Sequence, residues 1–234
     1  MPSEQKHLSI ILKKQPLNEG DELISIYTEH SGKLRVMAKS LKFSKSRLQH
    51  ALQTLFLTEV SLAGKSSIPT VIGAEVVNAF PRIRENLESA KISFYAIELT
   101  LKFTPDSEPN NELFLLLKSF LEFLNQTEDE VVKLVGLARF KIHFLQALGL
   151  GIQIPDDQHN AVAFSNSRGG FVTSGAAIDA VPVSTAAYAQ FLDYSHSTEW
   201  PTQPCGVAEL QQLLSGFLAY QLERDIRSES FLNE

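Results

Sequence analysis

The chain has 234 residues, of which 44% are hydrophobic, and its formal net charge is −6. This length and composition are enough for one large domain or two modest ones. No apolar run approaches the roughly 18 to 20 residues that cross a bilayer, and the first residues lack the apolar centre of a secretory signal. We therefore expect a cytoplasmic protein without a membrane partner. The single cysteine, Cys205, excludes an intramolecular disulfide and a zinc site of paired thiolates.

The net negative charge argues at first against a nucleic-acid partner, because phosphate binding needs clustered cations. The charge is unevenly distributed, however. Residues 1–80 hold ten Lys and Arg against seven Asp and Glu, a net charge of +3, whereas residues 81–234 hold eleven against twenty, a net charge of −9. This asymmetry directs attention to a basic face on the N-terminal part.

Short apolar stretches with near-alternation and intervening turn signals predict five β-strands in the first third of the chain. They fall within residues 8–14, 22–30, 32–40, 54–64 and 68–77. Five strands in roughly 70 residues fit a small closed barrel, either an OB-fold or an SH3-like barrel. The pattern alone does not separate these two folds.

After Pro81 the apolar spacing becomes helical. Offsets of three and four predict helices over residues 84–103, 112–127 and 129–150, the last closing at Gly149. Two short β-like runs around residues 161–175 predict a hairpin, and helices follow at 184–194 and 207–226, the last one packing back on the bundle. The predicted fold class is α+β. We expect a barrel domain at 1–80, a helical bundle at 81–150, a hairpin insertion at 151–182 and C-terminal helices at 183–234.

The sequence offers no catalytic motif. It has no phosphate-binding loop, no dinucleotide-binding glycine motif, no H-E-x-x-H pair and no G-x-S-x-G elbow. Its six histidines are not paired at helical spacing, so no metal pair is indicated. We therefore expect a protein that is not an enzyme and has neither a cofactor nor a bound metal.

Residues 32–49 contain six basic residues and no acidic one. On the predicted strand Lys33 and Arg35 alternate with Leu34 and Val36, which places a row of cations outward. Such a row fits a sugar-phosphate backbone, although a solvated surface loop has the same composition. Phe43, within the stretch, either stacks on a base or anchors the loop to the barrel. Lys13 and Lys14, at the end of the first strand, extend the row.

The order of several segments resembles the RecO family, bacterial mediators of recombinational repair. The resemblance is carried by residues 20–53, by AEVVNAFPRIRENL at 74–87, by RFKIHFLQALGLG at 139–151, by FSNSRGGFV at 164–172 and by LSGFLAYQLERDIRSESFL at 214–232. It spans almost the whole chain and rests on order and spacing rather than on one specific motif.

The resemblance implies an N-terminal OB-fold, a helical middle domain and a C-terminal element that in many members binds zinc through four cysteines. This sequence departs from that pattern, because no paired cysteines bracket the hairpin and neither His159 nor Asp156 or Asp157 completes a ligand set. We predict a zinc-less hairpin held by apolar side chains: Val162, Phe164, Phe171 and Val172.

The resemblance also implies DNA repair by recombination: binding of single- and double-stranded DNA, strand annealing, and loading of a recombinase on strands coated with single-stranded-DNA-binding protein, with RecR as companion. The DNA-binding residues it suggests are Lys13, Lys14, Lys33, Arg35, Lys39, Lys42, Lys45 and Arg47. Single-stranded-DNA-binding protein is expected to dock through an acidic, apolar C-terminal tail. Such a tail needs a hydrophobic slot with a cation at its rim, and the candidates for this cation are Lys133, Arg139 and Lys141. The alternative is a protein-interaction scaffold that does not bind DNA.

Overall fold

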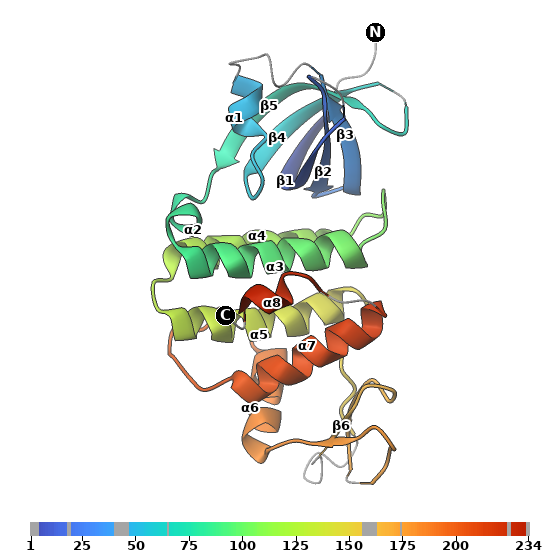
Figure 1. The fold of residues 1–234 in the computed structure, drawn as a ribbon, viewed down its shortest axis with the longest axis vertical. Coiled ribbons are helices and arrows are strands. Elements are labelled where there is room, and N and C mark those ends of the chain that lie inside the picture. The colour runs from blue at the N-terminus through green and yellow to red at the C-terminus, as the bar shows by residue number, and fades with distance from the viewer. Residues whose placement is uncertain are drawn as a thin grey trace. The chain divides into compact units, whose positions relative to one another are not determined.

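The structure is a computed structural model, and it describes residues 5–17, 20–39, 47–64, 66–155, 163–173, 175–223 and 226–232. The chain divides into two compact units, Met1–Asn125 and Gln126–Glu234. The first holds a β-barrel and a helical part, and the second holds helices and a small sheet (Figure 1). Within the described ranges, no helix has the length and apolar character to span a membrane.

Five strands form the barrel: β1 (Gln5–Pro16), β2 (Glu22–Thr28), β3 (Gly32–Ala38), β4 (Leu57–Ala63) and β5 (Thr70–Asn78). They close in the order β1-β2-β3-β5-β4, and all pairs are antiparallel except β3 with β5. This order is that of the five-stranded Greek-key barrel of OB-folds. The predicted barrel is therefore confirmed, and the strand order resolves the choice that the sequence pattern left open.

Alternate residues of the strands fill the barrel interior, as a period of two requires. The core consists of fully buried side chains such as Ile11, Ile24, Ile26, Val36 and Val60. One end is closed by α1 (Arg47–Ala51), a short helix in a stretch that the sequence analysis treated as loop. Its Leu48 packs against this core, which also includes Leu52, four residues later, because residues at that spacing share a helix face.

The first unit continues with α2 (Pro81–Glu85), α3 (Leu87–Phe103) and α4 (Asn111–Gln126). The prediction of one continuous helix from Arg84 was wrong. The helix breaks at Asn86, which is extended and whose side-chain oxygen accepts a hydrogen bond from Ser89 N at 2.7 Å, so that α3 begins with its own N-cap. The helical pair packs on the barrel, where Tyr27 of β2 stacks on Phe114 of α4.

The second unit contains α5 (Glu130–Ala147), α6 (Thr185–His196), α7 (Ala208–Leu222) and α8 (Glu229–Leu232). α5 packs against α6 and α7. α7 is shorter than predicted, because Glu223 adopts a left-handed conformation with φ 51° and ends the helix. The chain then forms α8 as a separate turn of helix.

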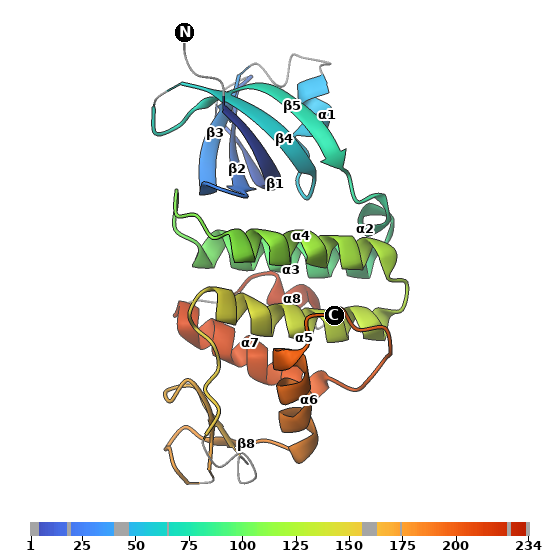
Figure 2. The same ribbon diagram turned by 180° about the vertical axis from the view of Figure 1, so that it is seen from behind.

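The predicted hairpin is confirmed as β6 (Ala163–Ser165) and β7 (Gly170–Val172), and a third strand, β8 (Val181–Pro182), pairs with β6 (Figure 2). The Phe171 side chain of β7 packs against three other aromatic rings. Its ring centroid lies 5.2 Å from that of Phe164, 4.8 Å from that of Tyr188 and 4.9 Å from that of Phe191. Phe164 and Phe171, two of the apolar residues predicted to hold the hairpin, thus take part in its packing. Val162 lies outside the described residues.

Candidate nucleic-acid interface

Strand register places two of the predicted DNA-binding residues on one outer face of the barrel. Lys13 of β1 pairs with Ser25 of β2, and Ser25 pairs with Arg35 of β3. Directly paired residues share a face of the sheet, so the three side chains form a row across the strands. Lys39 follows β3 with the same parity as Arg35. We call Lys13, Arg35 and Lys39, all of them exposed, the cationic face.

The cationic face suits phosphate contacts better than stacking on bases. Tyr27 is the one Phe, Tyr or Trp residue in β1, β2 and β3, and it is fully buried against Phe114. Stacking platforms for single strands require exposed aromatic rings, whereas backbone binding requires only cations. Phe43, the aromatic side chain suggested by the sequence, lies outside the described residues, as do Lys42, Lys45 and the side chain of Arg47.

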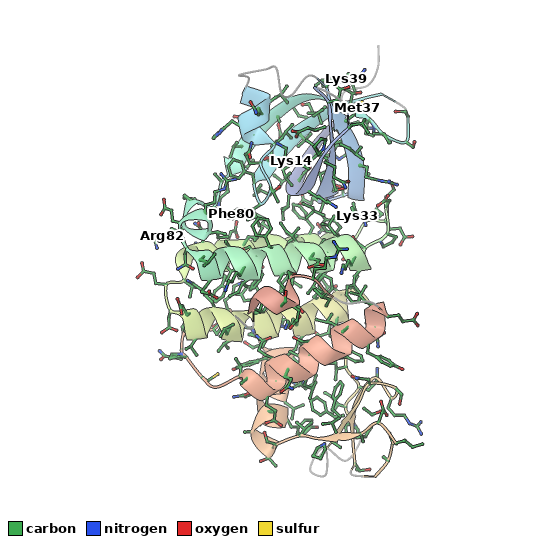
Figure 3. All side chains as sticks on the ribbon, viewed as in Figure 1. Lys14, Lys33, Met37, Lys39, Phe80 and Arg82 are labelled. Atoms are coloured by element: carbon green, nitrogen blue, oxygen red, sulfur yellow. The ribbon has the colours of Figure 1, made fainter. Side chains whose placement is uncertain are left out.

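Lys33 does not point freely outward as the strand pattern suggested, and that expectation was wrong. Its side chain is only 12% exposed, and its Nζ donates hydrogen bonds to the backbone oxygens of Leu101 and Thr104 (Figure 3). These carbonyls belong to the end of α3, where unpaired carbonyl groups attract a cation. Alternation identified the outer face correctly, but it gave no sign that a helix covers one end of that face.

Asp106, in the turn between α3 and α4, engages two of the predicted cations. Its carboxylate lies 2.9 Å from Arg35 Nη2 and 3.4 Å from Lys33 Nζ. The turn also follows β3 closely, since Ser107 N donates to Lys33 O at 2.8 Å. Gly32 is needed there, because a Cβ on it would lie 2.0 Å from the backbone oxygen of Glu108. In the sequence, this segment is placed only as the connection between two predicted helices.

Lys14 points to the opposite side of the sheet from Lys13. It pairs with Ile24, a residue of the barrel core, and its Nζ forms an ion pair with Glu22 at 3.1 Å. Adjacent residues of a strand face opposite sides, and a bulge in β1 between Ile11 and Lys13 shifts the register by one residue, so that Lys13 rather than Lys14 faces outward. Lys14 is therefore held at the barrel end rather than in the cationic face.

The three residues suggested for a partner slot all lie in α5, and all three are buried rather than at a rim. Lys133 and Lys141 are 1% exposed and Arg139 is 3% exposed. Arg139 donates to the backbone oxygen of Ser197 and lies over the Trp200 ring at 5.6 Å. Of the three, Lys141 lines a cavity.

The cavity beside Lys141 has a volume of about 750 Å³ and lies between α5, α7, α8 and residues 205–208. Its apolar wall includes Val131, Leu134 and Leu137. We call it the Lys141 groove. Lys141 Nζ donates to Gln211 Oε1 at 2.9 Å and to Ser215 Oγ at 2.6 Å, and burial lowers the pKa of this ammonium to about 8, an effect that Glu229 partly opposes.

Comparison with known proteins connects this architecture to one family. The family models described as Recombination protein O N terminal and Recombination protein O C terminal match residues 1–80 and 84–230. The chain belongs to the RecO family. The resemblance seen in the sequence is thereby confirmed.

Individual RecO proteins align with the chain over different lengths. The DNA repair protein RecO of Pelotomaculum thermopropionicum is 30% identical over 96% of this chain and 92% of its own length. The protein of the same name from Dehalococcoides mccartyi is 35% identical over 63% of this chain, and that alignment covers 57% of the relative. The Geobacter sulfurreducens protein of this name is 25% identical over 97% of this chain and 96% of its own length.

The described residues of the hairpin do not fit the zinc ion that the RecO resemblance implies for many members. Zinc prefers thiolate and imidazole ligands, whereas here the carboxylate of Asp179 accepts hydrogen bonds from the Ser165 and Ser167 hydroxyls and from Ser167 N. These bonds, that of Ser165 foremost, hold the pKa of Asp179 at about 2. Within the described ranges no group of three His, Cys, Asp or Glu side chains could bind a metal.

Proposed function

We propose that this chain acts in DNA repair and homologous recombination as a mediator that binds and anneals DNA without catalysing bond chemistry. It binds single and double strands through the cationic face, and it helps to load the recombinase on strands coated with single-stranded-DNA-binding protein, with RecR as companion. The relatives named DNA repair protein RecO support this role. The observation that carries the proposal is the row formed by Lys13 and Arg35 with Lys39 beside it.

Annealing places specific demands on such a surface. It must reduce the repulsion between two phosphate backbones while leaving the base edges free to pair. Exposed cations without exposed aromatic rings on the same strands meet this demand, because they contact the backbone and do not compete for the bases. Lys42, Lys45 and Arg47 remain part of the proposed DNA-binding set on sequence grounds. Lys33 and Lys14 belong to it only through the charge that they add nearby.

Replacing Lys13, Arg35 and Lys39 together by alanine should weaken single-stranded DNA binding by about tenfold or more, and should reduce the slope of log affinity against log salt by about 2. Each lost phosphate contact removes counterion release from the binding equilibrium. Fluorescence anisotropy of a labelled oligonucleotide at several salt concentrations measures both quantities.

The matched control replaces Lys91, Lys102 and Lys118, lysines of α3 and α4 that pair with glutamates of their own helices. It changes the net charge equally and should leave the salt slope nearly unchanged. An equal loss in both triple variants would show that net charge, rather than this face, attracts DNA. Absence of binding by the unmodified chain at low salt would reject the DNA role in favour of a protein scaffold.

Replacing Asp106 by asparagine should tighten DNA binding about two- to threefold, because the carboxylate that now neutralises Arg35 competes with phosphate. Asparagine keeps the size of the side chain and a hydrogen-bond acceptor for Arg35. The same anisotropy titration detects the change, with Glu85→Gln in α2 as a variant of equal charge change. Equal affinities for Asp106→Asn, Glu85→Gln and the unmodified chain would place Arg35 outside the DNA contact.

We further propose the Lys141 groove as the slot for the acidic, apolar tail of single-stranded-DNA-binding protein. A buried cation beside the apolar residues Leu134 and Leu137 can bind a carboxylate and the adjacent apolar side chains together. Arg139 and Lys133 do not border the groove, so in this proposal they support α5 and the 197–200 segment rather than the partner.

A further inference from the structure

Part of the Lys141 groove is lined by the chain's own C-terminal segment. Glu229 and Leu232 of α8 lie among its lining residues, and Glu229 Oε1 lies 3.8 Å from Lys141 Nζ. Just before them Ile226 and Ser228 are buried, at 6% and 8% exposure. The segment 226–232 thus brings one carboxylate and one leucine to the groove, the same two kinds of group that an acidic, apolar peptide would bring.

The segment is weakly constrained by its own structure. α7 ends at the left-handed residue Glu223, and α8 spans only Glu229–Leu232. A helix of four residues is not stable in isolation, because nucleation costs more than one turn of hydrogen bonds returns. The position of α8 therefore depends on its contacts with the groove, and such a contact can be exchanged for a similar one from another chain.

We propose that residues 226–232 are an internal occupant of the Lys141 groove and compete there with acidic, apolar peptides. This inference rests on the tail-docking role proposed above. In the closed state the Glu229 carboxylate faces Lys141 and Leu232 covers part of the apolar wall. A partner tail gains access when the segment lifts, so its apparent affinity is reduced by the fraction of molecules that are closed.

Cys205 offers a readout that needs no ligand, because it lines the same groove and is the only cysteine of the chain. In the full chain, Glu229→Gln with Leu232→Ala should raise the rate of Cys205 modification by Ellman's reagent about fivefold, since both contacts of the segment weaken. Glu223→Gln, an exposed carboxylate outside the groove, is the matched control and should leave the rate unchanged.

The second readout is anisotropy of a fluorescein-labelled peptide of aspartates ending in Leu-Phe. The double variant should bind this peptide about fivefold more tightly than the unmodified chain, because the competing segment is weakened. Thermal unfolding confirms that the variant is folded; if it is not, Leu232→Ala alone serves for both measurements.

The outcomes separate the two proposals. Faster Cys205 modification without peptide binding to either chain supports the internal occupant and rejects tail docking at this groove. Equal peptide affinity in both chains with an unchanged Cys205 rate overturns the internal occupant and leaves tail docking in place.

Discussion

Replacing Lys33 by methionine is expected to lower the free energy of unfolding by about 2 to 3 kcal/mol, as charge-assisted hydrogen bonds to two backbone carbonyls are lost. Lys33 Nζ donates to the oxygens of Leu101 and Thr104 at the end of α3, and methionine keeps the length of the chain without the donors. In the variant the two carbonyl groups lose the Lys33 donor while they stay at a helix end that β3 covers. Urea denaturation monitored by circular dichroism measures the change.

Lys39→Met provides the comparison for this stability prediction. Lys39 immediately follows the same strand and is exposed, so its replacement should change stability by no more than about 0.5 kcal/mol. In DNA binding the order should reverse, with the larger loss for Lys39. Equal stability losses in the two variants would mean that Lys33 contributes no more than a surface lysine.

The barrel could be predicted from the sequence because its information is local. Alternating residues such as Ile24, Ile26 and Val36 determine which side of each strand faces the core, and the turns mark the strand ends. The choice between an OB-fold and an SH3-like barrel depends instead on which strands pair where the barrel closes. The contact between β3 and β5, Met37 with Thr70, joins residues far apart in the chain and has no local signature.

The candidate DNA face could be predicted only in part, for a similar reason. Alternation placed Lys33 and Arg35 on the outer side of β3, and both are there. It could not show that the end of α3 covers Lys33 or that Asp106 pairs with Arg35, because these contacts come from residues about seventy positions away. The β-bulge between Ile11 and Lys13, which determines that Lys13 rather than Lys14 faces outward, is likewise a property of strand pairing.

The burial of Lys141 left a trace in the sequence. It stands between Phe140 and Ile142 in a helix whose apolar residues occur on every side, and a cation in such a run has no polar face to occupy. The identity of its partners could not be read from this pattern. Its partners Gln211, Ser215 and Glu229 lie at least seventy residues later in the chain. Glu229 also follows the end of α7 at Glu223, which the regular apolar spacing did not predict.

Stability is expected to rise with pH between about pH 7 and 9.5, by about 2 kcal/mol, through Lys141 alone. Its pKa is lowered by burial from 10.5 to about 8, so in this interval the unfolded chain binds more protons than the folded chain. The burial penalty of the ammonium is thus largest below pH 8 and is relieved as the folded state loses its proton. Urea denaturation at a series of pH values measures the rise.

Lys141→Met isolates this contribution, because methionine fills a similar volume and has no proton to lose. In that variant the rise below pH 10 should disappear, while stability at neutral pH should stay equal or increase, as replacement of a buried ion by an apolar side chain often does. Burial raises the pKa of Tyr27 to about 12, so above pH 10 the tyrosine loses its proton more readily in the unfolded chain than in the folded chain, and stability falls. The measurements therefore end below pH 10. Parallel pH profiles for the two chains would show that water reaches Lys141, and the groove would then lack the desolvated cation that an acidic tail requires.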